Sequence, residues 1–174
     1  MTLLVLVLIS ILVVAAAYRL LRGPNLPIGS LEDFEKHSYP VDLVAFENLL
    51  TSNHAQALEE HLPQNHKRIE RLRKRLILAY VSCIAKNCVL VLRLGESARL
   101  NGTGAVHDAS TELVREALHC RLTCLRAVVL CRLALWFDRP TGEVLADYRK
   151  VTSSLQHFTL ASDPTWLSRI SEKV

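Results

Sequence analysis

The feature that most constrains the fold is the stretch from Asn65 to about Leu100, where apolar residues recur every three or four positions. On a helix, at about 100° per residue, these residues form two rows on roughly opposite sides of the cylinder. One row, the seam, contains Ile69, Leu72, Leu76, Tyr80, Cys83, Asn87, Leu90 and Leu94. The other contains Leu78, Val81, Ala85, Val89 and Leu92. We therefore predict one long central helix with neighbours on both sides.

The same stretch carries basic residues at its N-terminal end. They fall within an arc of about 120° on the helix: Lys67, Arg68, Arg71, Lys74 and Arg75. Basic side chains in the first turns of a helix oppose its macrodipole, by about 0.3 to 1 kcal/mol each when exposed, so local stability does not explain them. We predict contact with an anionic lipid or another anionic partner, with a solvated helix face as the alternative. Because no aromatic residues alternate with these charges, nucleic acid is not the expected partner.

A second long helix is predicted from Asp108, its N-cap, to about Phe137, after a turn at 101–104. Small residues form one stripe, Cys120, Cys124, Ala127, Cys131 and Ala134, and large residues form the opposite one, Leu118, Leu122, Leu125, Val129 and Trp136. We expect this helix also to be buried on two sides and to form an antiparallel hairpin with the first. Arg115, Arg121, Arg126 and Arg132 lie on its flanks. Their charged ends lie in water or meet acidic residues of a partner, and the sequence leaves both open.

Shorter helices are expected to cover this pair. Their predicted starts are Ser30, Pro40, Asn53, Thr141 and Asp163. No strand pattern or repeat appears, and the composition suits helices. The predicted fold class is therefore all-α: an antiparallel helical bundle built on two long helices (about 65–100 and 108–137), with shorter covering helices, preceded by one N-terminal transmembrane helix.

Residues 2–22 form an apolar segment about long enough for one membrane-spanning helix. No Lys or Arg precedes it, whereas Arg19 and Arg22 lie at its C-terminal end, so the positive-inside rule places the following residues in the cytoplasm. A linker at 23–29, rich in Gly and Pro, leads to a helical domain at 30–174. The alternative is a secretory signal cleaved at Ala17, which would release a secreted helical domain. We favour an uncleaved anchor, because the segment lacks the charged start of a signal peptide.

The five cysteines lack the paired spacings of a disulfide framework and are typical of reduced thiols. Pairing of the two long helices about their turn would place Cys88 level with Cys120, and Cys83 level with Cys124. Cys83 and Cys88 lie about 140° apart around the helix, so both cannot face the same partner. We interpret the cysteines as small buried residues that let two helices approach closely. The alternative is a helical-bundle metal or haem protein that uses Cys and His residues between the long helices.

Motifs of enzymes and cofactor-binding proteins are missing from the sequence. It has no phosphate loop, dinucleotide fingerprint or nucleophile elbow. His54 and His61 share a helix face but lack the spacing of four that forms zinc sites of the His-Glu-x-x-His type. We expect no cofactor, and favour a membrane-tethered helical scaffold or interaction module over an enzyme. Its expected partners are the membrane, through the N-terminal anchor, and a protein or a second copy of the chain.

Overall fold

The structure is a computed structural model that describes residues 28, 30–51, 66–132 and 138–162. Over these residues all regular structure is helical, which confirms the all-α class. The helices are α2 (Leu31–His37), α3 (Leu43–Leu50), α5 (His66–Asn101), α6 (Ala105–Arg132) and α7 (Asp138–Ser162). The side chains of residues 66, 67, 132 and 138–140 lie outside the description. So do the segment 2–22 with its possible cleavage site, the linker apart from Ile28, and the helices expected from Asn53 and Asp163.

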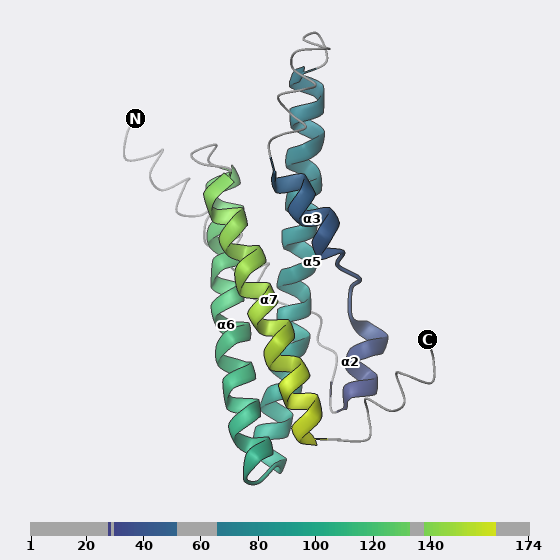
Figure 1. Ribbon diagram of the computed structural model, residues 1–174, viewed down its shortest axis with the longest axis vertical. Coiled ribbons are helices and arrows are strands. Elements are labelled where there is room, and N and C mark those ends of the chain that lie inside the picture. Colours follow the sequence, from purple (N-terminus) through teal and green to yellow (C-terminus); the bar gives the residue numbers. More distant parts are fainter. Residues whose placement is uncertain (1–27, 29, 52–65, 133–137, 163–174) are drawn as a thin grey trace, which may run out of the picture.

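The three long helices α5, α6 and α7 lie side by side, and each runs opposite to the one before it (Figure 1). The turn between α5 and α6 is short. The backbone N–H of Gly102 donates to the carbonyl of Ala98 (2.7 Å), and Gly104 adopts a φ of 60°, a left-handed conformation that favours glycine. Because the chain reverses so tightly, α6 begins at Ala105. The prediction that Asp108 is its N-cap is therefore wrong, since Asp108 N–H already bonds to the carbonyl of Gly104 (3.2 Å).

Small residues let α5 and α6 approach each other closely. A Cβ atom placed on Gly95 would lie 2.7 Å from a γ-methyl carbon of Val114, so the two helices meet without space for a side chain there. Further along the same two helices several small side chains are buried: Ala85, Cys88, Ala117, Cys120, Cys124 and Ala127. The predicted role of the small-residue stripe on α6 is thus confirmed at Cys120, Cys124 and Ala127.

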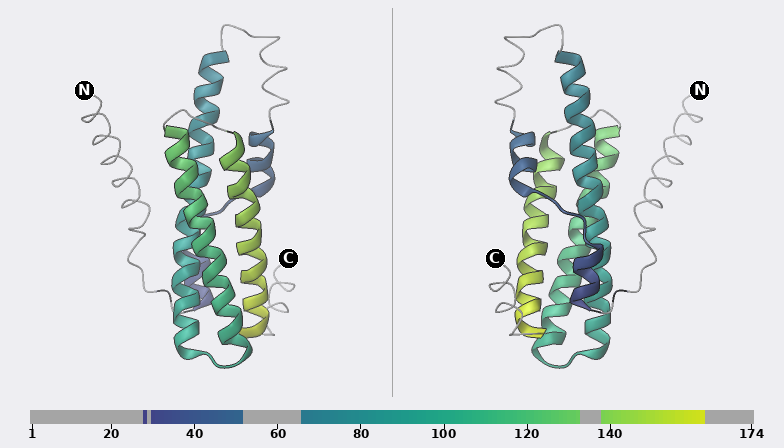
Figure 2. Two further views of the ribbon diagram at one scale, coloured as in Figure 1. Left: turned by 90° about the vertical axis from the view of Figure 1, so that its left-hand side faces the viewer. Right: turned by 90° about the vertical axis from the view of Figure 1, so that its right-hand side faces the viewer.

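The two apolar rows of α5 differ in burial. In the second row Val81, Ala85, Val89 and Leu92 are buried. The seam is buried only in its C-terminal half, at Asn87, Leu90 and Leu94. Leu72 and Leu76 are 50% and 51% exposed, so the prediction that the whole seam faces the core is wrong at its N-terminal end. Figure 2 shows that the first turns of α5 extend beyond the neighbouring ends of α6 and α7. At Leu76 neighbours are present, since the adjacent Ile77 is fully buried, so this leucine is exposed because it points away from them.

The large-residue stripe of α6 is also less buried than expected. Leu118 is 48% exposed and Leu122 is 63% exposed, while Leu125 and Val129 are partly exposed. Trp136 lies outside the described residues. The prediction that α6 is buried on two sides is therefore wrong. In the small-residue stripe Cys120, Cys124 and Ala127 are buried, whereas Leu118 and Leu122 of the large-residue stripe are exposed.

The short helices α2 and α3 pack against α5, and α3 also packs against α7. Ser30 caps α2 as predicted, because its hydroxyl accepts from Asp33 N–H (3.2 Å). Asp42, and not Pro40, caps α3. The ring of Phe46 on α3 is fully buried and stacks on Tyr80 of α5, with 5.1 Å between ring centroids.

A buried asparagine ties the chain before α3 to two long helices. The side-chain amide of Asn87 on α5 donates to the carbonyl of Tyr39 (2.9 Å), and its oxygen accepts from the N–H of the same residue (2.8 Å). The amide also donates to the hydroxyl of Tyr148 on α7 (2.9 Å). Burial raises the pKa of Tyr148 to about 12, so this hydroxyl stays protonated. One side chain thus joins α5, α7 and the segment between α2 and α3.

Helix α7 begins before the predicted cap. It spans Asp138–Ser162, and Thr141, the expected cap, is a fully buried residue inside the helix. The apolar residues of α7 face α6 and α5; those buried are Val144, Leu145, Tyr148, Val151 and Phe158. Helix α7 therefore closes the third side of the core between the long helices.

Candidate functional site

The predicted contact surface lies on the N-terminal half of α5. Arg68, Arg71 and Arg75 are exposed, and we refer to these three residues as the basic face. Lys74 is half-exposed, and its ammonium lies 2.6 Å from the carboxylate of Glu70, one turn earlier. The fifth predicted residue, Lys67, lies in α5, but its side chain is outside the description. Three guanidinium groups are thus available to an anionic partner.

Two exposed leucines lie beside the basic face. Leu72 is four residues after Arg68, and Leu76 follows Arg75 directly. On a helix, side chains three or four residues apart are neighbours, so Leu72 lies next to both Arg68 and Arg75. Sequence reasoning missed this surface because the leucines continue a seam that is buried further along α5. The available signal was that arginines stand four residues before Leu72 and three after it.

Two other basic residues of α5, Arg73 and Lys86, are held by intramolecular contacts. Arg73 donates to the carbonyls of Leu49 (2.8 Å) and Leu50 (2.9 Å), so it binds the C-terminal end of α3. The ammonium of Lys86 lies 4.8 Å from the ring centroid of Tyr39, a cation–π contact. These two residues position α3 and the chain before it, and the basic face remains directed away from the core.

Three of the five cysteines meet in the core. The thiols of Cys88 and Cys124 hydrogen-bond with that of Cys120, and all three side chains are fully buried. These hydrogen bonds lower the pKa of Cys120, and the bond to Cys120 together with burial raises the pKa of Cys124. The predicted neighbourhood of Cys88 and Cys120 is confirmed, whereas Cys83 lies elsewhere and is partly exposed.

The thiol contact is not arranged as a metal site. Over residues 28, 30–51, 66–132 and 138–162, no group of three or more His, Cys, Asp or Glu side chains could hold a metal ion. His54 and His61 lie outside these ranges. The geometry of the cysteines is that of small buried side chains at a close helix contact.

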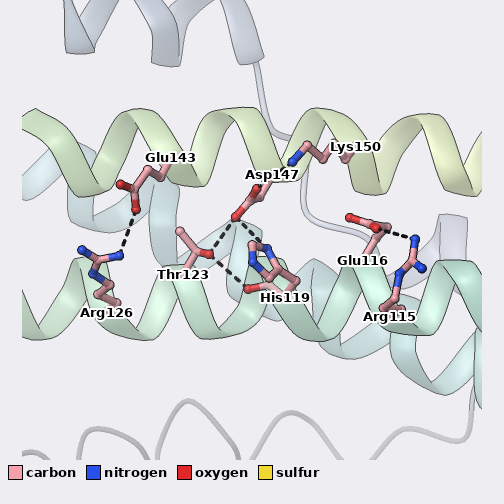
Figure 3. A network of polar contacts seen from close by, with 8 residues as sticks. All are labelled: Arg115, Glu116, His119, Thr123, Arg126, Glu143, Asp147 and Lys150. Atoms are coloured by element: carbon pink, nitrogen blue, oxygen red, sulfur yellow. Dashed lines mark hydrogen bonds and ion pairs between the residues drawn. The ribbon is translucent and has the colours of Figure 1, made fainter.

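Polar side chains connect α6 to α7 along one edge (Figure 3). Asp147 is buried, and its carboxylate accepts from the hydroxyl of Thr123 (2.7 Å) and lies 3.1 Å from Nδ1 of His119. The ammonium of Lys150 lies 3.5 Å from the other carboxylate oxygen. Sequence reasoning missed this group, because Asp147 lies on a helix whose facing partner could not be assigned from spacing.

Two of the four flank arginines of α6 meet acidic residues of the same chain, whereas Arg121 is half-buried. Arg126 lies 3.3 Å from Glu143 on α7, and Arg115 lies 3.1 Å from Glu116. Both arginines remain largely exposed, at 66% and 72% of their side chains. Such exposed pairs contribute at most about 1 kcal/mol each to stability. They orient the arginines without removing them from solvent.

Helix α5 is also long and apolar enough to cross a membrane, over Arg68–Asn101. However, 56% of its most apolar 18-residue segment is buried inside the protein, as in a core helix. Its apolar rows are largely explained by contacts with α2, α3, α6 and α7. Length and composition alone are therefore weak evidence that α5 spans a membrane.

Comparisons with protein-family models, curated proteins and solved structures found no match to this chain.

Proposed function

We propose that this protein is a membrane-tethered antiparallel helical bundle that acts as a scaffold or interaction module, and that its basic face contacts anionic lipid. The tether is the apolar segment 2–22, with residues 30–174 on the cytoplasmic side. The observation that carries the proposal is that Arg68, Arg71 and Arg75 are exposed on α5 with two half-exposed leucines among them.

This combination of side chains suits the interfacial region of a bilayer. Basic residues close to an anionic surface contribute about 1 kcal/mol each, so the basic face would contribute about 3 kcal/mol. Leucines beside them can insert into the boundary between headgroups and acyl chains, which adds about 1 kcal/mol each for half-exposed side chains. The sum is enough to hold α5 against a membrane to which the chain is already tethered.

The lipid contact can be tested with the full chain in nanodiscs, by hydrogen exchange of the peptide that covers residues 68–80. We expect slower exchange with anionic lipid than with zwitterionic lipid. The variant with Arg68→Gln, Arg71→Gln and Arg75→Gln should lose this difference, because the attraction depends on charge.

A charge-matched control is the variant with Arg115→Gln, Arg126→Gln and Arg149→Gln, which removes three exposed arginines of α6 and α7. This control should keep the lipid-dependent protection of α5. Equal exchange in both lipids for the unaltered chain would leave the basic face as a solvated helix surface.

The tether requires a separate measurement. Carbonate washing of membranes should leave the full chain in the pellet, and release of the protein would contradict a spanning anchor. The N-terminal residue of the mature protein distinguishes the secreted alternative, because a chain that begins at Met1 or Thr2 has not been cleaved at Ala17. A reporter fused after Val174 identifies the compartment.

The metal or haem alternative stays a prediction. Elemental analysis and a visible spectrum of the purified protein test it directly. Metal in stoichiometric amount, or a haem absorption band, would favour that alternative over a scaffold without a cofactor.

A further inference from the structure

We propose that α6 is a self-association surface, on which a second copy of this chain binds in antiparallel orientation. The surface is the leucine face, which we define as Leu118, Leu122, Leu125 and Val129. Leu118 and Leu122 are 48% and 63% exposed, and the other two residues are partly exposed. The proposal does not depend on lipid contact by the basic face.

The burial pattern of α6 indicates that the leucine face serves a partner. On this helix Ala117, Cys120, Cys124 and Ala127 are fully buried, whereas Leu118 and Leu122 are exposed, although Leu113 earlier on the helix lies in the core. Burial of leucine removes more apolar surface from water than burial of alanine or cysteine. Intramolecular stability alone would favour the reverse arrangement, so a contiguous exposed apolar stripe marks an interaction site.

The spacing of the leucine face identifies the partner as a helix. Successive members are four, three and four residues apart. This spacing matches the a and d positions of a heptad, whose narrow seam packs against one other helix. Leu122 and Val129 are then a positions, and Leu118 and Leu125 are d positions.

The charges beside the leucine face favour a second copy in antiparallel orientation. Glu112 and Arg126 lie on the same flank, each seven residues from His119. A two-fold axis near residue 120 places Leu118 against Leu122 of the partner subunit. The same axis brings Glu112 towards Arg126 of the partner subunit, at both ends of the contact.

A parallel arrangement is less favourable electrostatically. In a parallel pair, residues five apart on opposite flanks meet across the interface, so Arg126 would face the side of the partner helix that carries the half-buried Arg121 of the partner subunit. Like charges at such positions oppose pairing. In the antiparallel arrangement Arg126 stays near an acidic residue on both sides, since it also contacts Glu143 of its own chain (3.3 Å).

The test is sedimentation equilibrium of the full chain in density-matched detergent micelles. The unaltered chain should show a monomer–dimer equilibrium. Leu118→Glu and Leu122→Glu should each weaken it by about a hundredfold or more, because each substitution removes two leucines from a symmetric contact. Leu160→Glu, at a 46% exposed position on α7, is the matched control and should leave the equilibrium unchanged.

Charge reversal tests the orientation. Glu112→Arg alone or Arg126→Glu alone should weaken the dimer about tenfold, and the double variant should recover most of the loss. Absence of recovery would overturn the antiparallel arrangement.

Two other outcomes would overturn the proposal itself. One is a chain that stays monomeric at all concentrations, and the other is a dimer that the leucine variants do not weaken. A monomer in which Leu122→Glu speeds proteolysis within residues 1–27 would instead show that the chain's own N-terminal segment occupies the leucine face.

Discussion

At the scale of single residues, Asn87 is the side chain that joins three separate parts of the chain through hydrogen bonds. It is 3% exposed and satisfies both backbone groups of Tyr39 as well as the hydroxyl of Tyr148. A polar side chain in a core is tolerated only when its hydrogen bonds are made, and loss of one partner leaves the other groups unsatisfied. Asn87 therefore fixes where the segment between α2 and α3 crosses α5.

Replacement Asn87→Ala should lower the free energy of unfolding by about 2 to 4 kcal/mol, because it leaves the buried hydroxyl of Tyr148 and the part-buried backbone groups of Tyr39 without their partner. Urea unfolding followed by circular dichroism measures the change. Asn101→Ala provides a control at an exposed site, where the amide bonds only to the carbonyl of Ser97 (3.0 Å); its cost should be about 0.5 kcal/mol or less. Equal losses at the two positions would contradict the role assigned to Asn87.

Residue-level prediction from the sequence succeeded where the cause was local. Ser30 caps α2 because its hydroxyl lies three residues before an N–H that needs an acceptor. The burial of Asn87 also followed from its place in the seam. The partners of Asn87 could not be predicted, since Tyr39 and Tyr148 lie 48 and 61 residues away in the chain. For the same reason spacing along α6 could not show that Thr123 bonds to Asp147.

At the scale of elements, the contact between α5 and α6 depends on a glycine. Gly95 faces Val114, whose γ-methyl carbon would lie 2.7 Å from an added Cβ atom. Val114 is itself nearly buried and, as a β-branched residue in a helix, has little rotamer freedom to move away. The helices can therefore accept a larger side chain here only by moving apart.

Two matched substitutions test this contact. Gly95→Ala should destabilise the protein by about 1 to 3 kcal/mol, because overpacking outweighs the gain in helix propensity. Gly142→Ala in α7, where an added Cβ atom meets nothing within 4 Å, should instead stabilise it by about 0.5 to 1 kcal/mol. Thermal and urea unfolding measure both. A stabilising Gly95→Ala would show that α5 and α6 separate easily.

The spacing of apolar residues in the sequence predicts where a helix begins and ends better than it predicts which of its faces are buried. Helix α5 was expected at about 65–100 and spans His66–Asn101, because its two apolar rows repeat without interruption. Periodicity identifies an apolar row but not whether a neighbour reaches it. The prediction of a buried seam was therefore wrong at Leu72 and Leu76, and the prediction of a buried large-residue stripe was wrong on α6. Both failures lie on the two surfaces that we propose for function.

At the scale of the whole molecule, the reactivity of the cysteines toward a thiol reagent shows how the three long helices separate. Cys88, Cys120 and Cys124 are fully buried where α5 meets α6, and α7 covers the same region through Asp147 and Tyr148. Cys83 and Cys131 are partly exposed. A thiol reagent reaches the buried group only after α6 has moved away from its neighbours.

In the folded protein, a maleimide reagent should modify Cys83 quickly, Cys131 more slowly because burial raises the pKa of its thiol, and the three fully buried cysteines slowest. The slow rates should rise with urea in parallel with global unfolding, because α5, α6 and α7 share one core and the three thiols are fully buried in it. Peptide mass spectrometry of quenched samples measures each site separately. If the modification rates of Cys88, Cys120 and Cys124 depend equally on urea concentration, the three long helices unfold as one cooperative unit. A cluster that reacts as fast as Cys83 in the absence of urea would instead show that α6 opens from α5 while the rest of the core stays folded.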